Sequence, residues 1–180
     1  MDDAQSAKDR LTKMIFELTS QMREIFIEKF RKINYNFSQT FRDLFGGGQA
    51  ALEMDSDDVL TAGILIRVQP PGKLIRNLAA LSGGEQALTA IALYFAILQV
   101  QPAPFCVLDE IEAALDDVNV ARFAQYLHKL NVDTQFVAIT HRRGTMEQAD
   151  VLYGVTMQEE GVSTLLELSM AQVQQRWQLS

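Results

Sequence analysis

The sequence has 180 residues, which is enough for one domain with a substantial hydrophobic core. Hydrophobic residues make up 48% of it and charged residues 22%, as in an ordinary globular protein. No apolar run reaches the ~18 residues of a membrane span, and the polar first residues exclude a secretory signal peptide. The single cysteine, Cys106, rules out an intrachain disulfide, so we expect a protein of the reducing cytoplasm that has no membrane partner.

Acidic residues outnumber basic residues by 23 to 16, and the charge is unevenly distributed. Residues 1–45 contain eight Lys or Arg and seven Asp or Glu, whereas the remainder contains eight and sixteen. Because duplex affinity depends largely on neutralising phosphates, this balance argues against strong DNA binding by the chain alone. The chain is predicted to have two parts, and any DNA contact is expected near the first.

The first part is predicted to contain one long helix over residues 4–34. Its apolar residues follow the four-three spacing that is typical of a coiled-coil seam: Leu11, Ile15, Leu18, Met22 and Ile25. Lys29 interrupts this seam, and a second apolar stripe starts out of register with it: Phe26, Phe30, Ile33, Phe37, Phe41 and Leu44. The shift indicates a coil that enters a globular body, and the alternative is one amphipathic helix packed on its own domain.

Three glycines at 46–48 are predicted to end the helical section, and strands and helices then alternate. The expected elements are strands at 50–54 and 64–68, a helix at 82–101, a buried strand at 105–108, a helix at 118–130, a buried strand at 136–140, a hairpin of 153–158 with 162–168, and a polar tail at 169–180. This alternation predicts an α/β fold.

The segment Leu81–Gln86 places two glycines where the helix at 82–101 begins. Ser82 is a good N-cap, and Glu85 three residues later completes a capping box. The free N–H groups at Gly83 and Gly84, together with the helix dipole, form a candidate anion site. A well-capped helix without any ligand is the alternative.

Two carboxylates follow the apolar strand at 105–108. Asp109 and Glu110 are predicted to lie at the carboxyl edge of the sheet, where α/β proteins bind ligands. One carboxylate can hold Mg²⁺, usually through water, and the next can orient or deprotonate an attacking water. An ordinary loop start would show the same two acids.

Two further positions stand out downstream. Asp116 or Asp117 can cap the helix at 118–130, and His141 ends a strand predicted to point to the same edge as Asp109. His128 is interpreted as a surface residue and Cys106 as core packing.

Each motif is weak alone, but their order is specific. Leu-Ser-Gly-Gly-Glu, a strand ending in Asp-Glu, a second acidic loop and a strand ending in His resemble the signature motif, Walker B, D-loop and H-loop of ABC-class ATPases. FCVLDEIEAALDD, QFVAITHRRGTMEQADVLYGVTMQEEGVS and FRDLFGGGQAALEM resemble the C-terminal head of bacterial SMC chromosome-partitioning proteins. Ile111 stands where ABC transporters typically have proline, which argues against a transporter.

This resemblance implies an α/β fold, the C-terminal lobe of an ABC-type P-loop NTPase head, preceded by a long helix from an antiparallel coiled coil. It divides the chain into a head-proximal coil and head entry at 1–45, a head lobe at 46–168 and a polar tail at 169–180. It also implies that ATP and Mg²⁺ are bound, with Asp109 at the metal, Glu110 positioning the attacking water and His141 contacting the γ-phosphate. The implied nucleotide contacts are Ser82, Gly83, Gly84 and Glu85, acting on ATP of the opposite head, and Asp116 near the dimer interface.

A P-loop, GxxxxGK[ST], does not occur in these 180 residues. The only Gly-Lys pair is Gly72-Lys73, where Leu74 follows and Arg67 replaces the first glycine. The resemblance places the P-loop in an N-terminal lobe, so the chain is expected to be a truncation, gene fragment or expressed lobe without ATPase activity of its own.

The resemblance further implies four partners: the N-terminal lobe, a second head, DNA in the full complex, and a kleisin subunit with its associated proteins. Residues 8–34 and the C-terminal strands are the candidate surfaces for the kleisin. The expected location is cytoplasmic and nucleoid-associated. A related DNA-repair ATPase of the RecN or double-strand-break type, and an inactive assembly module, are the alternatives.

Overall fold

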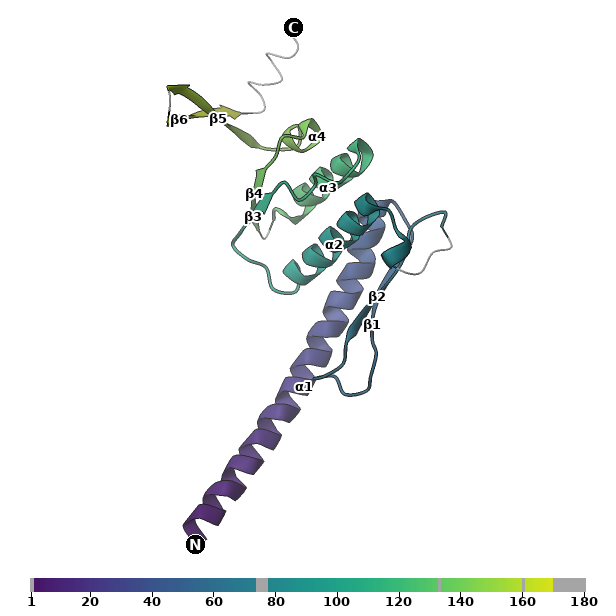
Figure 1. Cartoon of the computed structure of the whole chain (residues 1–180), viewed down its shortest axis with the longest axis vertical. Coiled ribbons are helices and arrows are strands. Elements are labelled where there is room, and N and C mark those ends of the chain that lie inside the picture. The colour runs from purple at the N-terminus through teal and green to yellow at the C-terminus, as the bar shows by residue number, and fades with distance from the viewer. Residues whose placement is uncertain (1, 74–77, 133, 160, 170–180) are drawn as a thin grey trace. The chain divides into compact units, whose positions relative to one another are not determined.

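The computed structural model describes residues 2–73, 78–132, 134–159 and 161–169. They belong to two compact units, Met1–Pro102 and Ala103–Ser180 (Figure 1). Within the described ranges, no helix is both long and apolar enough to cross a bilayer. The polar tail predicted at 169–180 lies outside the described residues except for Ser169, the last residue of a strand.

The first unit begins with a single continuous helix, α1 (Asp2–Phe45), which is longer than the helix predicted at 4–34 (Figure 1). As expected, the three glycines end it, and all three have positive φ. The Gly47 N–H donates to the Arg42 carbonyl at 2.9 Å. A Cβ on Gly48 would lie 2.4 Å from the Gln69 carbonyl oxygen, so only glycine fits where the chain turns back along the helix.

The two apolar stripes of α1 have different environments. The five seam side chains, from Leu11 to Ile25, are between 54% and 64% exposed. In the second stripe, Phe37, Phe41 and Leu44 are fully buried. The alternative of one amphipathic helix packed along its whole length is therefore wrong for the N-terminal half and correct for the C-terminal half.

The buried half of α1 carries the core of the first unit. The hairpin of β1 (Gln49–Met54) with β2 (Ile64–Gln69) and the helix α2 (Gly83–Leu98) pack against it (Figure 1). The short 3₁₀ helix η1 (Leu78–Ala80) precedes α2. Side chains tie these elements to α1: Asn34 accepts from the Leu52 N–H at 2.7 Å, and Gln99 donates to Thr40 at 3.1 Å.

The second unit is built on a parallel strand pair. The elements are β3 (Phe105–Asp109), α3 (Asp117–Leu130), β4 (Gln135–Ile139), α4 (Arg143–Met146), β5 (Val151–Glu159) and β6 (Val162–Ser169). Strands β3 and β4 pair in parallel, with Asp109 opposite Ile139. Strands β5 and β6 form the predicted antiparallel hairpin, with wider bounds than expected. Mixed helices and strands, with a β-α-β order at β3–α3–β4, agree with the α/β prediction.

The prediction that β3 and β4 are buried is wrong in this structure. Cys106 and Leu108 are buried, as expected for Cys106, but Phe105 is 62% exposed and Ile139 is 51% exposed. A parallel strand is buried on both faces only where both faces are covered. Here one face of β3 is buried, at Cys106 and Leu108, and the side chains that alternate with them are exposed.

Replacement of Phe41 tests which half of α1 carries the fold. Its ring stacks on Phe45 with centroids 4.0 Å apart and is fully buried. Phe41→Ala should lower the free energy of unfolding by about 3–5 kcal/mol, because it leaves a cavity. Ile15→Ala is the matched control and should cost less than about 0.5 kcal/mol, because Ile15 is exposed. Chemical denaturation measures both, and equal costs would contradict this assignment of the core.

Candidate functional site

The beginning of α2 has the predicted capping geometry. Ser82 is the N-cap with extended backbone angles, its Oγ accepts from the Glu85 N–H, and the Glu85 carboxylate accepts from the Ser82 N–H at 3.0 Å. Gly83 is the first helical residue, and a Cβ added to it would meet no atom within 4 Å. The helix end therefore offers N–H groups without intrahelical partners and open space beside Gly83, which suits an anion such as phosphate.

Glu85 is held by more than the capping box. Lys73 Nζ contacts both of its carboxylate oxygens, at 2.7 and 2.9 Å. The hydrogen bond from Lys73 and then the backbone hydrogen bond from Ser82 hold the pKa of Glu85 below its ordinary value. Glu85 is thus held as an anion that caps the helix.

The second group of predicted residues lies at the carboxyl end of β3. Asp109 is the last residue of the strand, and the Glu110 N–H donates to the Ile139 carbonyl at 2.9 Å, which extends the pairing by one residue. Glu110 then has φ of 46°, a left-handed conformation that is costly for a residue with a Cβ. Both carboxylates are exposed, so the strand end presents them to solvent.

His141 follows β4 and reaches the same edge. Its Nδ1 lies 3.2 Å from Glu110 Oε1, across the parallel pair. The prediction that this histidine and the acidic strand end share one edge is confirmed. The roles of donor and acceptor in this contact depend on the tautomer of the imidazole. The geometry brings together one carboxylate and one imidazole that can act on a single water or phosphate oxygen.

The remaining sequence predictions concern α3. Asp116 is its N-cap and accepts from the Asn119 N–H at 2.8 Å, whereas Asp117 accepts from Arg142 at 2.8 Å. His128 is exposed, and its Nε2 lies 3.6 Å from Asp150 Oδ1. This agrees with its interpretation as a surface residue. The capping interpretation of Asp116 is therefore correct, and Asp116 remains exposed at the end of the helix.

Sequence reasoning missed two side chains near the strand ends. Glu112 is 1% exposed and accepts hydrogen bonds from Thr140 and Thr145. Arg142 donates to the Leu115 carbonyl at 3.0 Å as well as to Asp117. The sequence did contain one signal for Glu112. It is an acidic residue within the otherwise apolar run Ile111–Leu115, and a solvated loop has no need of an apolar run.

The carboxylates at the strand ends bear on whether a metal ion could bind there. In the described ranges, no group of three or more His, Cys, Asp or Glu side chains is placed to hold an ion. Mg²⁺ usually keeps several waters and takes one or two carboxylates plus substrate phosphates. The exposed Asp109 carboxylate fits that mode of binding. The described residues do not form a site in which protein side chains supply all the ligands.

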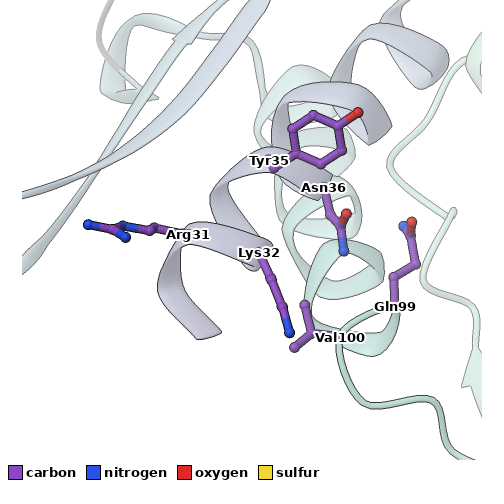
Figure 2. A pocket seen from close by; sticks show the side chains of 6 residues that line it. All are labelled: Arg31, Lys32, Tyr35, Asn36, Gln99 and Val100. Carbon is purple, nitrogen blue, oxygen red and sulfur yellow. The ribbon is translucent and has the colours of Figure 1, made fainter. Parts of the chain in front are cut away.

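A hollow elsewhere in the first unit lacks this chemistry. It has a volume of about 470 Å³ and lies between α1 and the end of α2 (Figure 2). It is lined by Arg31, Lys32, Tyr35, Asn36, Gln99 and Val100. Lys32 is already paired with Glu28 at 2.6 Å. The hollow contains none of the predicted site residues.

The fold is similar to that of SMC head structures. One similar structure comes from work on ATP-driven dimerization and DNA stimulated activation of SMC ATPases. It has a TM-score of 0.76 and 39% sequence identity, and the match covers 86% of this chain and 94% of that one. The Smc head domain with an extended coiled coil bound to the C-terminal domain of ScpA, from Pyrococcus furiosus, has a TM-score of 0.81 and 38% identity, covering 95% of this chain and 43% of that one.

The sequence comparison agrees. Residues 5–164 match the family described as RecF/RecN/SMC N terminal domain, and the chain belongs to that family. It is 55% identical to the chromosome partition protein Smc of Bacillus subtilis over 97% of its own length. It spans 15% of the length of that relative. The family description does not by itself assign the chain to a C-terminal lobe.

Replacement of Glu85 by Gln tests the charge at the α2 terminus. Gln keeps the capping hydrogen bond but removes the anion, so the variant should lose about 0.5–1 kcal/mol of stability at neutral pH. Because the folded pKa is lowered, this stabilisation is present above the ordinary pKa of 4.5 and is lost as pH falls through the folded value.

Denaturation curves at several pH values should therefore converge for wild type and Glu85→Gln on the acid side. Lys73→Met is the matched control, because it removes the ion pair and leaves the capping box intact. A difference between wild type and Glu85→Gln that is constant with pH would contradict the role of the charge.

Proposed function

We propose that this chain is the C-terminal lobe of an SMC-type ATPase head, which binds and hydrolyses ATP between two engaged heads to drive chromosome condensation and segregation. The contact of Glu110 with His141 at two neighbouring strand ends carries the proposal. The 55% identity to a chromosome partition protein supports the biological role. No observation favours the repair ATPase or the inactive module.

The assignment to the C-terminal lobe depends on motif order. The signature segment, the acidic strand end, the Asp116 loop and the His141 loop follow one another, and no P-loop pattern occurs in the 180 residues. A second lobe of the same protein would supply the P-loop, which holds the phosphates. Without it we expect no ATP hydrolysis by this chain.

The strand ends supply the chemistry of hydrolysis. Glu110 would accept a proton from the attacking water or orient it, and the imidazole of His141 would contact the γ-phosphate. Asp109 would hold Mg²⁺ through water, and the ion when bound neutralises charge on the phosphates. The left-handed backbone at Glu110 turns the chain immediately after the strand. Asp109 therefore ends the strand and Glu110 begins the turn, at the same edge.

The start of α2 would act on ATP held by the opposite head. Ser82, Gly83 and Gly84 present a helix terminus with open space, and Glu85 fixes its cap. Asp116 would lie near the interface between heads.

The partners follow from the same proposal. They are the N-terminal lobe, a second head, DNA in the full complex, and a kleisin subunit with its associated proteins. A Pyrococcus furiosus Smc head has been solved with ScpA, and that similar head supports a kleisin partner here. The exposed seam of α1 would pair with a second coiled-coil strand. We place the protein in the cytoplasm, on the nucleoid.

Replacement of Glu110 by Gln tests the proposed catalytic role in the complete head. Gln keeps the shape but cannot take a proton, so turnover should fall on the scale of general-base catalysis, about 10²–10⁴-fold. ATP should still bind, and engaged dimers should accumulate. Asp109→Asn is the control and should instead weaken Mg²⁺-dependent nucleotide binding. Steady-state hydrolysis by Glu110→Gln at the wild-type rate would reject the assignment.

A mixed dimer tests whether Ser82 acts on the opposite nucleotide. Ser82→Arg should leave ATP binding by its own head nearly intact and block head closure, while loss of the cap costs about 1 kcal/mol. A Ser82→Arg head is paired with a head that lacks the P-loop lysine. If Ser82 acts across the interface, one composite site carries both lesions and the other carries neither, so turnover persists. If turnover vanishes although the dimer forms, Ser82 acts within its own head.

A further inference from the structure

The buried carboxylate of Glu112 lies beside the proposed hydrolytic site but faces away from solvent. It is 1% exposed, although it is only two residues from the exposed Glu110. Its Oε1 accepts from the hydroxyl of Thr140 and, at 3.0 Å, from the hydroxyl of Thr145. Burial of a carboxylate costs free energy unless hydrogen bonds compensate it, and these two hydroxyls provide such bonds.

The Thr140 hydroxyl joins Glu112 to the backbone around His141. It donates to Glu112 and accepts from the Arg142 N–H at 2.9 Å. His141 is the residue between Thr140 and Arg142, so the chain is fixed on both sides of the imidazole. Arg142 adds a second tie, because its guanidinium donates to the Leu115 carbonyl.

The other end of this connection is the turn that carries Glu110. The Ala113 N–H donates to the Glu110 carbonyl at 3.0 Å, and the Leu115 N–H donates to the Glu112 carbonyl at 2.9 Å. Residues 110–115 therefore form consecutive turns with Glu112 at their centre. The carboxylate joins the segment after β3 to the segment after β4, beyond the end of the strand pairing.

We propose that Glu112, acting through Thr140, is a positioning residue that holds His141 at its distance from Glu110. This inference rests on the proposed ATPase function of the strand ends. In this proposal neither group contacts the nucleotide: Glu112 is buried, and the Thr140 hydroxyl already donates to Glu112 and accepts from the Arg142 N–H. Their loss should let the imidazole move and lower the rate of the chemical step, while ATP binding at the P-loop is unchanged.

The test uses the complete head and compares two threonines that donate to the same oxygen. Thr140→Val removes the hydroxyl that borders His141 and should lower kcat about 10–100-fold with KM for ATP unchanged, as expected for a misplaced catalytic group. Thr145→Val removes the matched hydroxyl in α4 and should leave kcat near wild type. Thr140→Ser restores a hydroxyl and should recover most of the activity.

A double-mutant cycle with His141→Ala makes the role specific. If Thr140 acts through the imidazole, Thr140→Val should cause no further loss of kcat once His141 is alanine. Glu112→Leu, which removes the acceptor that Thr140 shares with Thr145, should follow the same pattern and serves if Thr140→Val does not fold.

The outcomes separate this inference from the function on which it rests. Equal losses from Thr140→Val and Thr145→Val, or a Thr140→Val loss that persists in the His141→Ala background, would overturn the positioning role. If the wild-type complete head hydrolyses no ATP, or if His141→Ala and Glu110→Gln are both fully active, the proposed ATPase site itself is wrong.

Discussion

The parallel pairing of β3 with β4 is the constraint on which the candidate site depends. The register sets Asp109 opposite Ile139, and the hydrogen bond from the Glu110 N–H to the Ile139 carbonyl fixes where the pairing stops. Side chains alternate between the faces of a strand, so a slip of one residue would send them to opposite faces and separate Glu110 from His141. A two-strand pair is marginally stable alone, and the buried side chains of Cys106 and Leu108 add apolar packing on one face of β3.

Two features that lower the stability of the folded chain lie at the strand ends, where the chemistry is proposed. A left-handed conformation at Glu110 costs about 1–2 kcal/mol, and Glu112 adds the desolvation of a buried carboxylate. Strain of this kind persists only where the surrounding contacts determine it. Here the turns at 110–115 and the hydroxyls of Thr140 and Thr145 provide those contacts. The same network that stabilises the turn leaves little freedom to the two groups at the edge.

Local patterns predicted the site better than the core. The capping box at Ser82 and Glu85 could be predicted because both partners lie within one turn of helix, and His141 could be placed because strand direction alone decides its edge. The exposure of β3 and β4 could not be predicted, because the sequence of an apolar strand does not show whether another layer covers it. Glu112 was missed for a related reason: its burial depends on hydroxyls 28 and 33 residues away along the chain.

Among the described residues, large apolar side chains stay exposed on the α1 seam, on one face of β3 and β4, and on the β5–β6 hairpin. The α1 seam follows four-three spacing along a helix that its own unit does not cover, which suits a second helix wound against it. One face of β3 and β4 carries the exposed side chains of Phe105, Val107, Val137 and Ile139, which suits another layer of an α/β domain. Contiguous exposed apolar surface on a globular chain marks an interaction site. In the proposed head, a second coiled-coil helix would cover the α1 seam, and the lobe with the P-loop would cover the exposed face of β3 and β4.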